Sequence, residues 1–190
     1  MDFFSQLTPD VRKLLFGQSV PGDAYVSEVV LVSSKLDFIG LTLRTGVQFV
    51  LAFMSEVELA TDIDFARNQA NSWAVFLTGH QLDPTARTVK LFRADASHSE
   101  TRFSQTDLGS PRAIWDLQGL LTRAVVSYTQ NRPLVKQFFF IPASEALERW
   151  YDRLSRDFCR PSGALSSGIV FRRIACPKPG EGGFYGYERI

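Results

Sequence analysis

The side chains best suited to acid–base chemistry are scarce in this sequence of 190 residues. Histidine has the ordinary pKa closest to neutrality, and it occurs only at His80 and His98. His98 stands between two serines in a predicted turn, and His80 ends a predicted strand. Neither has a second histidine, a cysteine or a carboxylate at the spacing of metal ligands. We therefore expect no metal site, and neither histidine stands in a catalytic motif.

Motifs for phosphate binding and for activated nucleophiles are also missing. The sequence has no GxxxxGK[ST] loop and no GxSxG elbow, and its glycine-rich segment 177–183 indicates a turn. Basic residues gather in the last quarter, where they form either a solvated face or a local anion site: Arg149, Arg153, Arg156, Arg160, Arg172 and Arg173. A net charge of +1 argues against a protein that coats nucleic acid, although these arginines keep a salt-dependent contact open.

The composition indicates a globular protein with an aromatic core. Hydrophobic residues make up 45% and charged residues 22%, and there are 16 phenylalanines. No apolar run approaches the ~18 residues of a membrane span, and the N-terminus lacks the features of a signal peptide. We expect a cytoplasmic protein in which Cys159 and Cys176 are reduced, because nothing in the sequence supports a disulfide between them.

The elements that must position any site follow from capping residues and periodicity. Thr8 and Pro9 open a short helix, Thr45 and Gly46 form the turn of a hairpin over 37–54, and Ser110 and Pro111 open the longest helix. The remaining predicted elements are strands at 24–32, 72–80, 85–95, 100–107, 138–141, 168–175 and 184–190, and helices at 56–71 and 144–158. We predict a single α+β domain over residues 1–190, with helices packed on a mostly antiparallel, mixed sheet.

Residues 103–158 carry a family resemblance. A strand is followed by a threonine and a glycine before a helix, and then by the pattern R-x-x-Y-D-R-L. The matching residues are Thr106, Gly109, Arg149, Tyr151, Asp152, Arg153 and Leu154. This third of the chain resembles the central half of the GNAT acetyltransferase fold, and most of all the divergent GNAT-like proteins of phages and mobile elements. The resemblance implies a GNAT-like fold.

The resemblance also implies a site for acetyl-CoA. Its pyrophosphate would lie at the start of the central helix, on Leu108, Gly109, Ser110 and Arg112. Tyr151 would be the general acid toward the departing thiolate, the strands at 168–175 and 184–190 would complete the acceptor site, and an open split would separate the strands at 100–107 and 137–141. The base stays open between Glu28, Glu56 and a water molecule.

The chain departs from the family at this loop. It has one glycine where the family has two, Asp107 would bring negative charge to a pyrophosphate, and Pro111 removes an N–H donor. Tyr151 lies beside Trp150 on an apolar helix stripe, so core packing also explains it.

The sequence therefore predicts a non-catalytic GNAT-like protein, of phage or mobile-element type and without a cofactor. It would act by binding another protein or itself. Exposed aromatic residues near the termini could form the interface, unless they pack in the core: Phe3, Phe4, Phe184, Tyr185 and Tyr187. The alternative is an acyl-CoA-dependent N-acetyltransferase.

Overall fold

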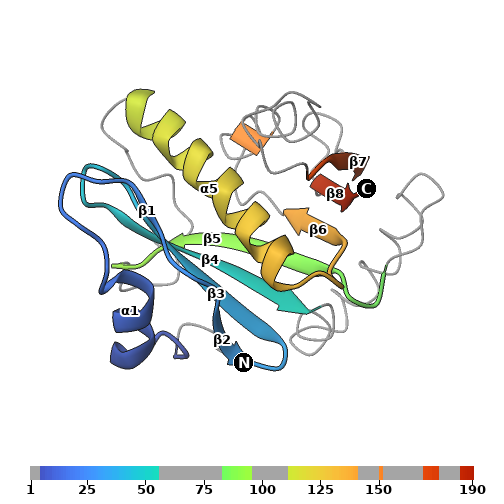
Figure 1. The fold of residues 1–190 in the computed structure, drawn as a ribbon, viewed down its shortest axis with the longest axis horizontal. Helices are drawn as coiled ribbons and strands as arrows, with labels where there is room; N and C mark the ends of the chain where they lie inside the picture. Colours follow the sequence, from blue (N-terminus) through green and yellow to red (C-terminus); the bar gives the residue numbers. More distant parts are fainter. Residues whose placement is uncertain (1–4, 56–82, 96–110, 141–149, 152–168, 176–184) are drawn as a thin grey trace. The chain divides into compact units, whose positions relative to one another are not determined.

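The fold is taken from a computed structural model (Figure 1). It describes residues 5–55, 83–95, 111–140, 150–151, 169–175 and 185–190. They form an α+β fold with a mixed, mostly antiparallel sheet, which confirms the predicted fold class at this level. None of the described helices is long and apolar enough to cross a membrane.

The chain groups into two compact units, each made of separate stretches of sequence. We call residues 2–52 and 90–131 the α5 unit, after its long helix. Residues 1, 53–89 and 132–190 form the β8 unit. Strands β4 (Gln48–Ser55) and β5 (Arg87–Arg93) contribute residues to both units.

Helix α1 (Pro9–Phe16) begins and ends where the capping residues predict. The Thr8 hydroxyl accepts a hydrogen bond from the backbone N–H of Val11 at 3.3 Å, and Gly17 follows the last turn. The helix buries Leu15 and Phe16 and packs against the sheet of the α5 unit.

The strand predicted at 24–32 is interrupted and forms β1 (Tyr25–Val26) and β2 (Val30–Ser33). Both pair antiparallel with β3 (Leu36–Thr42). The interruption lies at Ser27, whose hydroxyl accepts the Gly40 N–H at 2.8 Å while its own N–H donates to the Gly40 carbonyl at 2.9 Å. The Ser27 side chain thus replaces one backbone partner in the hydrogen-bond ladder. This replacement explains why the prediction of a continuous strand over 24–32 was wrong.

The predicted hairpin is confirmed by β3 and β4. Its turn is closed by hydrogen bonds from Leu43 N to the Val47 carbonyl at 2.9 Å and from Gly46 N to the Leu43 carbonyl at 2.8 Å. Gly46 has a φ of 85°, a conformation that a side chain would strain. All seven residues of β3 are buried, so this strand lies in the core of the α5 unit.

Helix α5 (Pro111–Asn131) begins at the predicted proline and packs on β1 and β3 (Figure 1). Its buried face includes the predicted Leu117, Leu121, Ala124, Val125 and Tyr128. Ile114 was predicted on the same stripe, but it lies in the first turn and is 37% exposed. The Tyr128 hydroxyl donates to the Asp37 carboxylate at 2.8 Å, and both side chains are buried, so a polar contact ties the helix to β3.

In the α5 unit the strand order is β1-β3-β4-β5, with β2 also on β3; a hydrogen bond of 3.0 Å joins Ala94 N to the Gln48 carbonyl. In the β8 unit the order is β5-β6-β8-β7. Here β6 (Gln137–Phe140) runs parallel to β5, whereas β8 (Tyr185–Arg189) is antiparallel to β6 and to β7 (Phe171–Ala175). The predicted strands at 85–95, 138–141, 168–175 and 184–190 are thereby confirmed within a few residues.

The elements predicted at 56–71, 72–80 and 100–107 lie outside the described residues. Of the helix predicted at 144–158 the structure describes Trp150 and Tyr151, and both are helical.

Candidate functional site

The predicted general acid, Tyr151, lies in an aromatic cluster of the β8 unit. Its ring is 5.5 Å from the ring of Phe140 on β6, 5.7 Å from Tyr185 on β8 and 5.6 Å from Trp150. Phe140 and Tyr185 are directly opposite each other in the β6–β8 register, so one face of these two strands carries the rings on which Tyr151 packs. The core-packing interpretation of Tyr151 therefore accounts for its position.

Burial sets the chemistry that Tyr151 can perform. Its side chain is 4% exposed, and this burial raises the pKa of the phenol because the phenolate would lose its hydration. The phenol therefore stays protonated at neutral pH, as a general acid must be. A general acid must also reach the atom that it protonates, and the aromatic packing leaves little of Tyr151 open to a ligand.

Further aromatic residues of β6 and β8 extend this cluster. Phe138 on β6 contacts Phe53 and Phe171 edge to face, at centroid distances of 6.3 and 6.1 Å. Tyr187 lies opposite Phe138 in the register and contacts Phe140 at 5.8 Å. Tyr185 and Tyr187 were considered for an interface near the C-terminus; both are buried, so the core interpretation holds for them. Phe3, Phe4 and Phe184 lie outside the described residues.

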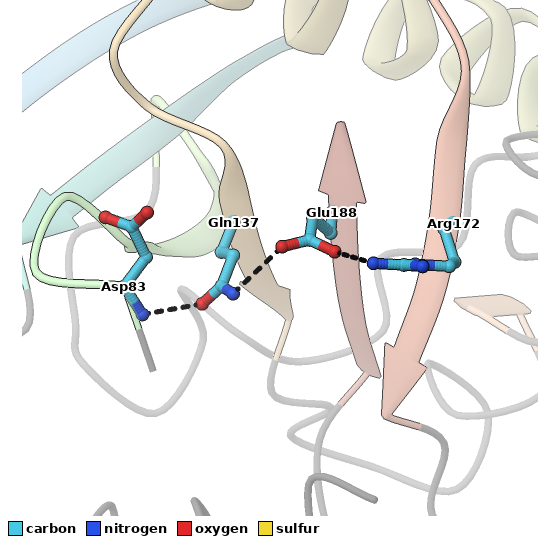
Figure 2. Close-up of polar contacts among 4 residues, drawn as sticks. All are labelled: Asp83, Gln137, Arg172 and Glu188. Atoms are coloured by element: carbon cyan, nitrogen blue, oxygen red, sulfur yellow. Dashed lines mark hydrogen bonds and ion pairs between the residues drawn. The ribbon is translucent and has the colours of Figure 1, made fainter. Parts of the chain in front are cut away.

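Polar side chains join four segments of the β8 unit in one chain of contacts, shown in Figure 2. The Gln137 carbonyl oxygen Oε1 accepts from the Asp83 backbone N–H at 2.8 Å, and its amide Nε2 donates to Glu188 Oε1 at 3.3 Å. Arg172 forms an ion pair with the other carboxylate oxygen, Oε2. Gln137, Glu188 and Arg172 are consecutive partners in the register of β6, β8 and β7, so they share one face of the sheet.

The contacts of this chain join neighbouring strands. Each carboxylate oxygen of Glu188 has a partner, Gln137 on one side and Arg172 on the other, so the side chain bridges β6 and β7. Asp83 in turn accepts hydrogen bonds from the Thr85 hydroxyl and backbone N–H, at 2.6 and 2.7 Å. The Thr85 hydroxyl bond is the main reason that the pKa of Asp83 is lowered. Arg172 belongs to the predicted arginine group and is used for an ion pair here; the members before it lie outside the described residues.

The predicted acetyl-CoA residues are only partly described. Arg112 is exposed in the first turn of α5, whereas Leu108, Gly109 and Ser110 lie outside the described residues. Strand β6 has β5 and β8 as its two neighbours, and β5 pairs with it through the register Arg87↔Phe138 to Val89↔Phe140. The split considered between 100–107 and 137–141 stays a prediction, because 100–107 lies outside the described residues.

Most of the other residues considered for chemistry lie outside the described part of the chain. His80, His98 and Glu56 fall outside them, and Glu28 is exposed in the α5 unit whereas Tyr151 belongs to the β8 unit. Among the described side chains no group of histidine, cysteine, aspartate and glutamate could hold a metal ion.

The outward face of α5 was not predicted as a site, although it carries a large exposed aromatic residue. Trp115 is 61% exposed, and Arg112, Gly119 and Arg123 are exposed on the same side of the helix, with Asp116 half-buried among them. The signal was present in the sequence, because Trp115 falls outside the apolar repeat of Leu117, Leu121 and Ala124. A tryptophan on the polar side of an amphipathic helix indicates a contact surface.

Comparison of the chain with family models, with curated proteins and with solved structures gave no match. Functional inference therefore depends on the chemistry of these surfaces.

Proposed function

We propose that this chain is a non-catalytic, GNAT-like protein that acts through protein–protein interaction, of the phage or mobile-element type that the resemblance implies. The observation that carries the proposal is the exposure of Trp115 on α5, at 61%. Tryptophan and arginine are the residues that most often dominate binding energy at interfaces, and Trp115 lies between exposed arginines on one helix face.

Tyr151 supports the same proposal from the β8 unit. Its ring contacts with Phe140, Trp150 and Tyr185 account for its burial without a catalytic role. A general acid must also bring its hydroxyl within hydrogen-bond distance of the departing thiolate, and the described contacts of Tyr151 are ring contacts.

A second candidate function, an acyl-CoA-dependent N-acetyltransferase, is favoured by one observation. Strands β5 and β6 run parallel, and the chain between them contains α5, a crossover that brings a helix N-terminus into the connection. In this alternative Leu108, Gly109, Ser110 and Arg112 would hold the pyrophosphate of acetyl-CoA, and Tyr151 would protonate the thiolate.

Isothermal titration of the full chain with acetyl-CoA separates the two functions. We expect no binding at millimolar acetyl-CoA, because the proposed function has no cofactor. Micromolar binding that is weakened by Arg112→Glu would overturn the proposal in favour of the acetyltransferase. Arg44→Glu is a matched control, since Arg44 is also exposed but belongs to the turn of the β3–β4 hairpin.

A further inference from the structure

The outward face of α5 has a defined pattern of side chains. We call Arg112, Trp115, Asp116, Gly119 and Arg123 the α5 stripe. Their spacing of three and four residues places them along one side of the helix. Toward the start of the helix the stripe has a basic, an aromatic and an acidic residue, then a glycine in its middle and a second basic residue beyond the glycine.

Gly119 has no described role within its own chain. It lies in the interior of a 21-residue helix, where glycine destabilises the helix by about 1 kcal/mol relative to alanine. A Cβ atom at this position would meet no described atom within 4 Å, and φ is not in the left-handed region. Packing and backbone conformation therefore allow a side chain here. Because residue 119 has no side chain, the helix backbone is uncovered beside Trp115, and another backbone can approach it closely.

The α5 stripe of one copy is complementary to the α5 stripe of a second copy that runs antiparallel to it. Trp115 lies four residues before Gly119 and Arg123 lies four residues after it. If two α5 helices cross antiparallel at Gly119, Trp115 of each copy faces Arg123 of the other. A guanidinium on an indole face is a favourable cation–π contact, and the two-fold axis would make it twice. Asp116 lies next to Trp115, so its carboxylate also comes within reach of the facing arginine.

We infer that the partner bound by the α5 stripe is a second copy of this chain, packed antiparallel about Gly119. This inference rests on the proposed function, whose interaction surface it identifies. A different partner would need to supply its own cation opposite Trp115 and its own acid opposite Arg123. The second copy supplies both from residues that are already exposed or half-buried at the matching positions.

Sedimentation velocity of charge-swapped variants tests the pairing. Asp116→Arg and Arg123→Glu each place like charges at both contacts, so each should weaken dimerisation roughly tenfold or more. When the two variants are mixed, one contact pairs the new arginine with the new glutamate and the other pairs the original Asp116 with the original Arg123. The mixture should therefore dimerise, and the double variant should dimerise more weakly than the wild type but better than either single variant, because its charge pairs are restored while its cation–π contacts are lost. Arg44→Glu should dimerise like the wild type.

Gly119→Ala is a further test, because it should change the stability of the fold and the affinity of the dimer in opposite directions. It should raise the thermal stability of the chain and weaken the dimer, because the added methyl groups separate the two helices. Thermal melts of every variant confirm that the fold is retained before dimerisation is compared.

Three outcomes overturn the inference. One is a wild type that stays monomeric at every soluble concentration. Another is a dimer that none of the α5 variants weakens, because self-association then uses a different surface. The third is a mixture that stays monomeric although both variants are folded, which would show that positions 116 and 123 do not face each other across the dimer. None of these outcomes involves acetyl-CoA, so they are distinguishable from the failure of the proposed function.

Discussion

Two helical aromatic residues, Tyr151 of the β8 unit and Trp115 of the α5 unit, have opposite environments. Tyr151 is enclosed by Phe140, Trp150 and Tyr185, whereas Trp115 is mostly exposed on a helix face that carries arginines. The resemblance pointed to Tyr151, and the structure points to Trp115.

The two environments distinguish an aromatic side chain of the core from one that we propose for an interface. Tyr151 follows the apolar periodicity of its predicted helix, and this periodicity indicates core packing. Trp115 falls outside the apolar periodicity of α5 and is 61% exposed, so it adds little to the core of the described residues. Substitutions of buried residues should therefore lower the stability of the fold, whereas substitutions on the outward face of α5 should leave it almost unchanged.

The largest difference should appear when each ring is removed. Tyr151→Ala should lower the free energy of unfolding by about 3–5 kcal/mol, because it leaves a cavity between β6, β8 and Trp150. Trp115→Ala should change it by less than about 0.5 kcal/mol, since its side chain is mostly in solvent. Urea denaturation at a concentration where the chain is monomeric measures both. A loss of more than about 2 kcal/mol for Trp115→Ala would show that this indole packs on its own chain.

The buried face of α5 allows a second comparison, between a tyrosine hydroxyl hydrogen-bonded in the core and a tyrosine that is half-buried. Tyr128→Phe removes the hydroxyl that donates to the buried carboxylate of Asp37, so it should destabilise the chain by about 1–3 kcal/mol. The half-buried Tyr25 of β1 is a control, and Tyr25→Phe should have almost no effect. A double-mutant cycle with Asp37→Ala isolates the pair, and additive effects of the two substitutions would mean that the contact contributes no stability.

Two glycines of the α5 unit should respond to alanine with opposite signs. At Gly40 a Cβ atom would lie 2.6 Å from the Leu15 carbonyl oxygen and 2.9 Å from a Phe16 ring carbon, so Gly40→Ala should destabilise by about 1–3 kcal/mol. At Gly119 an added Cβ atom would meet no described atom within 4 Å, and Gly119→Ala should stabilise by up to about 1 kcal/mol. Chemical denaturation at a concentration where the chain is monomeric measures both. Destabilisation by Gly119→Ala would indicate that the fold itself requires this glycine.

The smallest effect concerns pH and the polar contacts of the β8 unit. The pKa of Asp83 is lowered in the folded chain, mainly by the hydrogen bond from the Thr85 hydroxyl. The Asp83 carboxylate therefore binds a proton more readily in the unfolded chain than in the folded one. Its contribution to stability is present above the ordinary value of 3.8 and is lost as the pH falls through the lower folded-state pKa. Thr85→Val should reduce stability by about 1 kcal/mol or less at neutral pH, and by less in acid. An equal loss at both pH values would exclude this linkage.

Local rules predicted most of the described fold. The Thr8 cap, Pro111 at the start of α5 and Gly46 in the hairpin turn depend on interactions over a few residues, which the sequence displays directly. The break between β1 and β2 depends on the Ser27 hydroxyl reaching the Gly40 N–H, 13 residues away, and no local pattern encodes that contact.

The polar contacts of the β8 unit illustrate the same limit. Gln137, Glu188 and Arg172 come together through the register of three strands, two of which are far from the first in sequence. Strand neighbours are set by the topology, so the parallel pairing of β5 with β6 could not be predicted from local patterns. The α5 stripe could have been found from the sequence, because a tryptophan off the apolar stripe of a helix is a local signal.

The most direct test of the account is ¹⁹F NMR of the chain labelled with 5-fluorotryptophan, which reports on Trp73, Trp115 and Trp150 separately. Replacing each tryptophan by phenylalanine assigns the signals. We predict that dilution shifts the Trp115 signal, because its partner dissociates, and that acetyl-CoA leaves the Trp150 signal beside Tyr151 unchanged. A Trp115 signal that is independent of concentration, together with a Trp150 signal that shifts with micromolar acetyl-CoA, would contradict the account.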